Sequence, residues 1–285
     1  MRPAHIFQSM TTSTDPLAGV DWLGFCQRAA LGATGALERY PLASDRAATS
    51  GQGVGGDMAL VIDRAVEDVI FEQLEQLALP LTAVSEERGE VLIGGGGPVH
   101  VVIDPIDGSR NAKRGIPAYA LSIAVAGGPT MGDVEFGYIY DFSHRQEWWA
   151  RRAEGACLEG ERVTPLASEG ELEMVGLETT HPTLIERYGD ALTATGASRL
   201  RGLGSIALSL CYVAAGRFDG MLTLGDTRSV DCAAGQLIVR EAGGAVAFPE
   251  AGEDPLGATL DIDARYRVFA AATPALLERL LEVGA

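Results

Sequence analysis

The chain has 285 residues, of which 39 are acidic and 22 basic, so its formal net charge at pH 7 is −17. This length corresponds to about two domains, and a hydrophobic fraction of 47% excludes an intrinsically disordered chain. The negative charge argues against sequence-independent binding to DNA or anionic lipid, because their phosphates would be repelled. A protein of this charge that handles phosphate esters needs a metal ion to reverse the local sign.

The first segment of the chain lacks the apolar core of a signal peptide, and residues 1–16 are expected to form a disordered leader. Asp15 and Pro16 resemble a helix N-cap followed by proline at the first helical position. Apolar residues then recur with a helical period from Trp22 to Ala33, which predicts a first helix.

A polar, glycine-rich link is expected over residues 44–56, and a second helix from Met58 to about Leu79. Short apolar runs then follow, interrupted at close spacing by Gly, Pro or Asp, which predicts an antiparallel sheet. The predicted strands cover residues 81–85, 99–103, 119–126, 136–140 and 147–150. The four glycines at 94–97 are interpreted as a turn, because no Lys-Ser or Lys-Thr pair follows them.

From about Met174 strand and helix patterns alternate, which predicts a second α/β layer. Its predicted elements cover residues 174–178, 206–215, 220–224, 232–242, 267–271 and 274–283. We therefore expect an N-terminal α+β subdomain over residues 17–175 and a C-terminal α/β subdomain over residues 176–285.

The cysteines are far apart and form no C-x-x-C pair, which indicates reduced thiols in a cytosolic protein. They are Cys26, Cys157, Cys211 and Cys232. No apolar stretch reaches the roughly eighteen residues that a membrane-spanning helix requires. The expected location is the cytoplasm, with neither a membrane nor a nucleic-acid partner.

Carboxylates are concentrated where the predicted strands end. Glu86 and Glu87 follow one strand, and Asp104 and Asp107 follow another. The proline after Asp104 is expected to stop that strand, and the glycine after Asp107 permits a tight turn that returns Ser109 toward the same pocket. Two aspartates three residues apart on a rigid bend repel each other unless a cation lies between them.

Further acids lie on predicted helices. Asp63 and Glu67 are one turn apart on the second helix, and Asp231 begins a late helix, where a carboxylate is favoured. A ligand set made only of oxygen atoms, without His or Cys, selects a hard ion such as Mg²⁺ or Mn²⁺.

Several motifs, in this order along the chain, resemble the signatures of the inositol monophosphatase superfamily. They are Ser85-Glu-Glu87, Asp104-Pro-Ile-Asp-Gly-Ser109, Asp231-Cys-Ala-Ala-Gly235 and its extension Glu241-Ala-Gly-Gly244. Asp57, Asp63 and Glu67 match the early helix of that family, and the similarity runs over about residues 17–284. The resemblance implies a layered αβαβα sandwich, a member of the α+β class, that hydrolyses small phosphate monoesters with Mg²⁺.

The resemblance also implies the ligands of the metal ions, most of them in the N-terminal subdomain. A first ion would be held by Glu86, Asp104 and the backbone carbonyl of Ile106. A second would be held by Asp104, Asp107 and Asp231. A third, weaker ion would share Glu86 through water, so two to three Mg²⁺ are expected per subunit, with Mn²⁺ as a substitute.

Catalytic roles are implied for Asp63, Ser109 and Glu86. Asp63 and Ser109 would orient and deprotonate the water on the first ion. Elementary chemistry agrees, because a metal lowers the pKa of bound water and two adjacent ions steady both oxygens of an in-line displacement. The N–H groups of Gly108 and Ser109 can bind the phosphate, so no covalent phosphoenzyme is required.

The sequence indicates less clearly which residues recognise the alcohol part of the ester. Gly204, Ser205 and Ile206 resemble the family segment that contacts substrate hydroxyls at a helix start. In animal members a glutamate seven residues before the last metal aspartate also grips the inositol ring, but that position is Leu224 here. The tryptophan that usually precedes the aspartate is Val230.

Basic residues flank the motifs and can grip the second phosphate of a bisphosphate. They are Arg110, Lys113, Arg114, Arg199, Arg201 and Arg228. The complete substrate-binding set that we expect is Asp107, Gly108, Ser109, Gly204, Ser205, Ile206, Arg201, Arg228 and Asp231.

The leading hypothesis is hydrolysis of inositol 1-phosphate to inositol and phosphate by metal-activated water. Fructose 1,6-bisphosphate is the main alternative substrate, alone or in a dual activity, followed by a 3′-phosphoadenosine nucleotide and histidinol phosphate. A non-enzyme alternative is a regulatory interaction protein that retains the fold, since some superfamily members also act with the transcription machinery. The resemblance further implies a homodimer.

Overall fold

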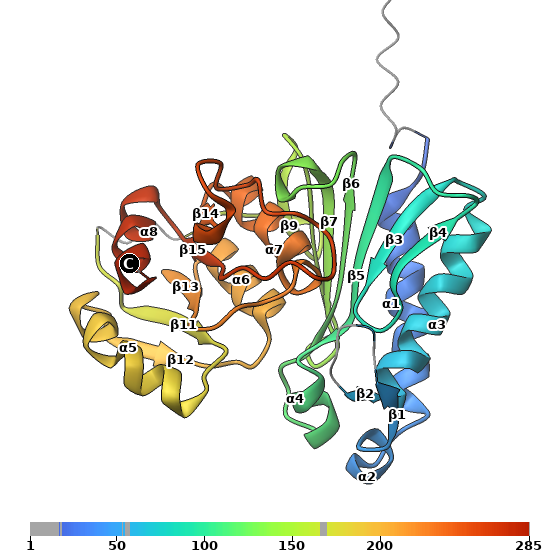
Figure 1. Cartoon of the computed structure of the whole chain (residues 1–285), viewed down its shortest axis with the longest axis horizontal. Helices are drawn as coiled ribbons and strands as arrows, with labels where there is room; N and C mark the ends of the chain where they lie inside the picture. Colours follow the sequence, from blue (N-terminus) through green and yellow to red (C-terminus); the bar gives the residue numbers. More distant parts are fainter. Residues whose placement is uncertain (1–16, 18, 53, 55–57, 166–169, 285) are drawn as a thin grey trace, which may run out of the picture.

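The structure is a computed structural model that describes residues 17, 19–52, 54, 58–165 and 170–284. Its helices and strands form five alternating layers, α-β-α-β-α, as the resemblance implies (Figure 1). The expected leader, residues 1–16, lies outside the described residues.

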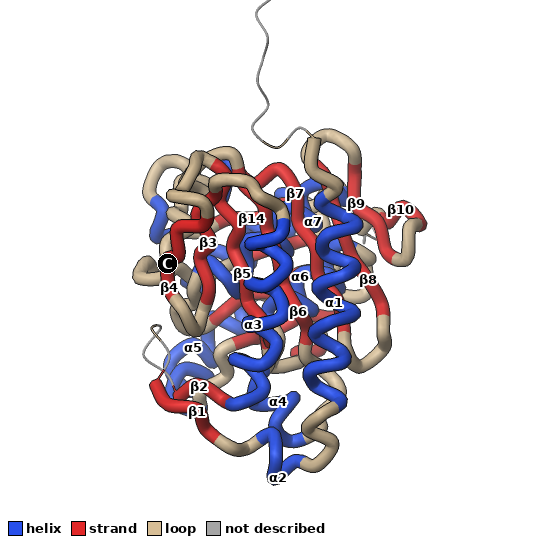
Figure 2. The backbone as a smooth tube through the Cα atoms, turned by 90° about the vertical axis from the view of Figure 1, so that its right-hand side faces the viewer, coloured by secondary structure: helices blue, strands red, loops and turns tan. Residues whose placement is uncertain are grey.

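The first layer consists of two long helices, α1 (Trp22–Glu38) and α3 (Val61–Gln76), which pack together on one face of the larger sheet (Figures 1 and 2). The N-cap of α1 is Asp21, whose carboxylate accepts a hydrogen bond from the N–H of Gly24 at 3.0 Å, whereas the expected cap at Asp15 and Pro16 lies outside the described residues. The face of α1 turned to the sheet buries Trp22 and Phe25.

Two predicted boundaries before α3 are wrong. The expected link contains a short helix, α2 (Ala43–Arg46), and a strand, β1 (Thr49–Gln52), which pairs with β2 (Met58–Leu60). The helix therefore begins at Val61 rather than Met58. Its start is set by Asp63, whose Oδ2 accepts a hydrogen bond from the N–H of Leu60 at 3.2 Å.

The second layer is an eight-stranded sheet with the strand order β10-β9-β8-β7-β6-β5-β3-β4. Its strands are β3 (Leu81–Ser85), β4 (Gly89–Ile93), β5 (Val99–Asp107), β6 (Ala120–Ala126), β7 (Val134–Asp141), β8 (Gln146–Arg151), β9 (Gly155–Leu158) and β10 (Glu161–Val163). All neighbours are antiparallel except β3 and β5, which are parallel, so the predicted antiparallel sheet is confirmed with that exception. The pattern did not predict β4, β9 or β10.

Pro105 does not stop its strand, contrary to the prediction. The β5 strand continues to Asp107, and its pairing with β6 shifts register between Asp104 and Asp107. Proline is tolerated at such an irregularity because no ladder hydrogen bond needs its missing N–H. The irregularity re-aims the acidic side chains at the end of the strand.

The middle layer holds α6 (Ile206–Ala214) and α7 (Ser229–Ala242), packed between the two sheets. The second sheet has the order β12-β11-β13-β15-β14. Its strands are β11 (Met174–Glu178), β12 (Arg199–Arg201), β13 (Gly220–Thr223), β14 (Ala245–Ala247) and β15 (Phe269–Ala271). The last layer is formed by α5 (Pro182–Ala194) and α8 (Pro274–Leu281); the sequence pattern did not predict α5, β12 or β14.

The α7 helix approaches β7 so closely that only glycine fits at residue 137. A Cβ atom on Gly137 would lie 2.7 Å from the carbonyl oxygen of Ala234. We expect Gly137→Ala to lower the free energy of unfolding by about 2 kcal/mol, because backbone rather than a side-chain tip must move. Gly189→Ala in α5 is the control, because a Cβ atom on Gly189 meets nothing within 4 Å. The melting temperature of this variant should equal or exceed that of the wild type. Equal melting temperatures for both variants would contradict this packing.

None of the described helices is long and apolar enough to cross a membrane. The four cysteines are buried and carry free thiols, as their spacing predicted.

Candidate active site

Acidic side chains from two layers meet at one point. Asp104 and Asp107 at the end of β5 and Asp231 in the first turn of α7 each place a carboxylate oxygen within 4.8 Å of the others. Asp104 is 1% exposed and Asp107 7% exposed. Carboxylates this close and this poorly hydrated repel one another unless a cation or a proton lies between them.

Hydrogen bonds fix the two acids of β5. Asp104 Oδ1 accepts from the N–H of Ile106 at 2.9 Å. Asp107 Oδ2 accepts from the N–H of Ala207 at 2.7 Å and from the hydroxyl of Ser205. Asp107 therefore joins the end of the large sheet to the start of α6.

Asp231 is held in a similar way. Its Oδ2 accepts from the N–H of Arg228 at 2.9 Å and from the hydroxyl of Thr227. The carboxylate thereby caps α7, where the helix dipole favours a negative charge. These hydrogen bonds all use one oxygen of the carboxylate and orient the other oxygen.

Glu86 lies beside this group but pairs with a base. Arg228 Nη1 donates to Glu86 Oε1 at 2.6 Å, and among the described residues Glu86 does not belong to the group whose oxygens lie within 4.8 Å. Burial, and then repulsion from Asp231, raises the pKa of Glu86 well above its usual range. Sequence reasoning placed Glu86 and Arg228 in the site but did not predict that they pair.

Asp63 and Ser109, expected to act together, are neighbours. Asp63 is 3% exposed, and within the described part of the chain its Oδ1 is buried without a hydrogen-bond partner. Burial, followed by repulsion from Glu87, raises the pKa of Asp63 to about 7, whereas the Ser109 hydroxyl lowers it. The same hydroxyl donates to the carbonyl of Ile106 at 2.8 Å.

The electrostatics of the whole site fit a hard divalent cation. Burial raises the pKa of Asp107 to about 8, and repulsion from Asp231 adds to this. Burial raises the pKa of Asp104 well above its usual range, and repulsion from Glu86 is the next cause. Oxygen donors that repel one another in this way form the kind of ligand set that Mg²⁺ or Mn²⁺ prefers.

The turn between β5 and the short helix α4 (Ser109–Arg114) requires glycine. Gly108 has a φ of +87°, and a Cβ there would lie 2.8 Å from the carbonyl oxygen of Ala118 and 3.0 Å from that of Gly204. This turn brings the motif of residues 104–109 against the loop that precedes α6.

The residues expected to contact the substrate hydroxyls lie in that loop, as Gly204 and Ser205, and at the start of α6, as Ile206. Ser205 is the N-cap of α6 and accepts from the N–H of Leu208 at 3.2 Å. The N–H groups of Leu203 and Gly204 both donate, at 2.9 Å, to the carboxylate of Glu178 at the end of β11. Sequence reasoning missed Glu178, although it too is an acid at the end of a predicted strand.

Known proteins resemble this chain in sequence and fold. The model of the inositol monophosphatase family matches residues 25–283. The chain belongs to the inositol monophosphatase family.

Individual relatives support the family assignment. The chain is 35% identical over 240 residues to a fructose-1,6-bisphosphatase/inositol-1-monophosphatase of Methanothermobacter thermautotrophicus, covering 81% of this chain and 84% of that protein. It is 36% identical over 206 residues to the Nus factor SuhB of Escherichia coli, covering 70% and 75%. The crystal structure of the extragenic suppressor protein SuhB from Bartonella henselae superposes with a TM-score of 0.78 at 28% identity, covering 93% of this chain and 98% of that one.

Other residues that resembled the family pattern lie outside the acidic group. Asp57 lies outside the described residues. Glu67 is buried, accepts from the Ser85 hydroxyl, and pairs with Arg88 Nε at 3.1 Å. It therefore ties α3 to the end of β3. Arg201 is exposed on β12, and its guanidinium donates to the carbonyl of Leu200 at 2.9 Å.

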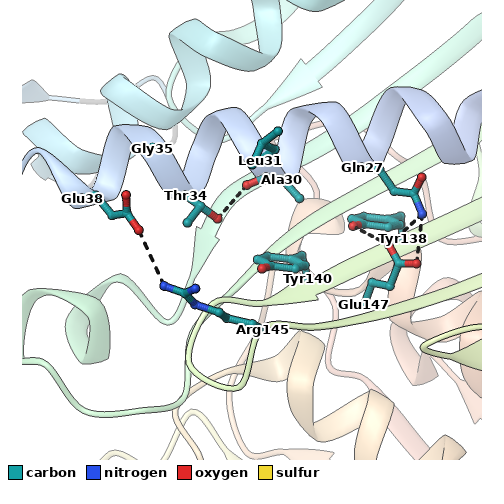
Figure 3. A pocket seen from close by; sticks show the side chains of 10 residues that line it. All are labelled: Gln27, Ala30, Leu31, Thr34, Gly35, Glu38, Tyr138, Tyr140, Arg145 and Glu147. Atoms are coloured by element: carbon teal, nitrogen blue, oxygen red, sulfur yellow. Dashed lines mark hydrogen bonds and ion pairs between the residues drawn. The ribbon is translucent and has the colours of Figure 1, made fainter.

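A separate cavity of about 340 Å³ lies between α1 and the β7–β8 hairpin (Figure 3). Glu147 in its wall accepts from Gln27 at 3.0 Å and from the Tyr138 hydroxyl at 3.2 Å. None of the residues expected in the family's site lines this cavity. This cavity is therefore distinct from the acidic group.

Proposed function

We propose that the chain is a Mg²⁺-dependent phosphomonoesterase that hydrolyses a small cyclitol or sugar phosphate, with inositol 1-phosphate as the leading substrate. The observation that carries the proposal is the convergence of Asp104, Asp107 and Asp231 within 4.8 Å, in a chain of this family. The proposal includes two to three ions per subunit, a homodimer and a cytoplasmic location, all of which rest on the family resemblance.

In this proposal Glu86, Asp104 and the Ile106 carbonyl hold one ion, and Asp104, Asp107 and Asp231 hold another. When bound, the ions neutralise the phosphate, stabilise the developing charge and lower the pKa of water. The acids are held by hydrogen bonds to one oxygen each, so little reorganisation is needed at the moment of reaction.

The chain's own residues supply proton transfer and orientation. Asp63, buried beside Ser109, accepts a proton from the attacking water once the ions favour its ionised form. The Ser109 hydroxyl donates a hydrogen bond to the Ile106 carbonyl, so its oxygen can accept a hydrogen bond from the same water. The N–H groups of Gly108 and Ser109 bind the phosphoryl oxygens.

The substrate is tested by measuring phosphate release from D-myo-inositol 1-phosphate and fructose 1,6-bisphosphate in parallel with Mg²⁺. We expect the higher kcat/KM for inositol 1-phosphate. The Arg201→Gln variant then tests the basic residues that flank the motifs. A loss of kcat/KM confined to the bisphosphate would make Arg201 a contact of the second phosphate. A higher kcat/KM for the bisphosphate in the wild-type protein would reverse the order of the two substrates.

A regulatory role is the second candidate, because several relatives that match over 70% of this chain or more are named Nus factor SuhB. The Asp104→Asn variant separates the two roles in a complementation assay, in which the variant and the wild type are each tested for replacing the missing protein in cells. We expect the variant to fail, because the proposed role is catalytic. Full complementation by an inactive variant would favour the regulatory role.

A further inference from the structure

Glu178 is a buried acid outside the expected metal ligands. It ends β11, is 2% exposed, and accepts three hydrogen bonds. Its Oε1 accepts from the N–H of Leu203 at 2.9 Å and from the hydroxyl of Ser209 at 2.7 Å, and its Oε2 accepts from the N–H of Gly204 at 2.9 Å. A carboxylate this deep is retained in a fold only when its oxygens are satisfied in this way.

The partners of Glu178 lie on the loop before α6. Two consecutive N–H groups, those of Leu203 and Gly204, turn inward to the carboxylate. The opposite side of the loop is fixed independently, because Asn111 Nδ2 donates to the Leu203 carbonyl at 2.7 Å and the Gly204 carbonyl lies against Gly108. Glu178 and Asn111 therefore hold the loop from opposite sides, and together they fix which of its groups face the turn at Gly108.

The backbone of Glu178 is tied to the neighbouring strand, β13. Its carbonyl accepts from the N–H of Leu224 at 3.1 Å, and Glu178 is in register with Thr223. The strand pairing therefore fixes the point from which the carboxylate reaches the loop.

We infer that Glu178 is a positioning residue for substrate recognition: it holds the loop of Leu203 and Gly204 in the conformation that receives the polyol part of a cyclitol or sugar phosphate. This inference rests on the proposed phosphatase function. Glu178 acts through the loop and does not touch the substrate. Recognition of the polyol then depends on the shape of the backbone rather than on a carboxylate that contacts the ring.

The test compares Glu178→Gln with Ser209→Ala, using inositol 1-phosphate and 4-nitrophenyl phosphate, which has no polyol. Glutamine cannot accept at both ends, so one loop N–H loses its acceptor, whereas Ser209→Ala leaves both loop hydrogen bonds in place. We expect Glu178→Gln to raise KM for inositol 1-phosphate about tenfold, with kcat within about twofold and KM for 4-nitrophenyl phosphate unchanged. Ser209→Ala should leave all three values near those of the wild type.

Hydrogen exchange of the peptide that contains residues 203 and 204 gives a readout that does not depend on activity. It should be faster in Glu178→Gln and unchanged in Ser209→Ala, and Glu178→Asp, which keeps the charge with a shorter reach, should lie between. If Glu178→Gln leaves KM for inositol 1-phosphate unchanged, or raises KM equally for both substrates, the inference is overturned. A wild type inactive on both esters would instead contradict the proposed function, and unchanged exchange would show separately that Glu178 does not hold the loop.

Discussion

Asp231→Asn is expected to lower turnover about 1,000-fold, the equivalent of about 4 kcal/mol of transition-state stabilisation. The variant removes one negative charge from a group of three carboxylates that lie within 4.8 Å. Its fold should survive, because the amide oxygen of asparagine can still accept from the N–H of Arg228 and the hydroxyl of Thr227. The effect should therefore appear in kcat and in the Mg²⁺ activation constant, with little change in melting temperature.

Asp226→Asn is the matched control, because it makes the same change on an exposed side chain of the segment that precedes α7. It should keep wild-type turnover. An Asp231→Asn enzyme that is as active and as metal-dependent as the wild type would remove Asp231 from the metal site.

In EDTA, the melting temperature is expected to fall by about 5 °C or more as the pH rises from about 6 to about 9. The folded protein raises the pKa of Asp63 to about 7 and that of Asp107 to about 8, whereas both titrate near pH 4 in an unfolded chain. At pH values above about 4 and below about 7 to 8, the folded state therefore holds more protons than the unfolded state. The free energy of unfolding must then decrease as the pH rises through this window.

Excess Mg²⁺ should remove most of this dependence, because a bound cation favours the ionised acids that burial and repulsion otherwise disfavour. Thermal unfolding in EDTA and in Mg²⁺ at both pH values measures the effect. Asp107→Asn should weaken the pH dependence of the melting temperature in EDTA, whereas Asp226→Asn, at an exposed position, should not. A flat EDTA profile for the wild-type protein, or no stabilisation by Mg²⁺, would show that the acids are not organised as described.

Much of the site could be predicted because its residues follow a local rule. Asp104, Asp107 and Asp231 were recognised as acids at the ends of strands or the start of a helix, and the structure brings these three together. The layered fold followed from the same motifs through the family resemblance, and strands β3, β5, β6 and β7 follow from their apolar runs.

The missed features depend on contacts between distant parts of the chain. The pairing of Glu86 with Arg228 joins residues 142 positions apart, and neither periodicity nor spacing carries such information. The continuation of β5 through Pro105 depends on pairing with β6, which overrides the local tendency of proline to end a strand. Glu178 satisfied the strand-end rule, but its partners on the loop before α6 became apparent only in three dimensions.

The measurement that tests the central claim most directly is a Mg²⁺ titration of phosphate release from inositol 1-phosphate, followed by EDTA and then by renewed Mg²⁺. The account predicts saturable activation, complete loss in EDTA and recovery when Mg²⁺ is restored, with the activated rate about 1,000-fold lower in Asp231→Asn. Phosphate release that persists in EDTA, or that is equal in the wild type and Asp231→Asn, would contradict it.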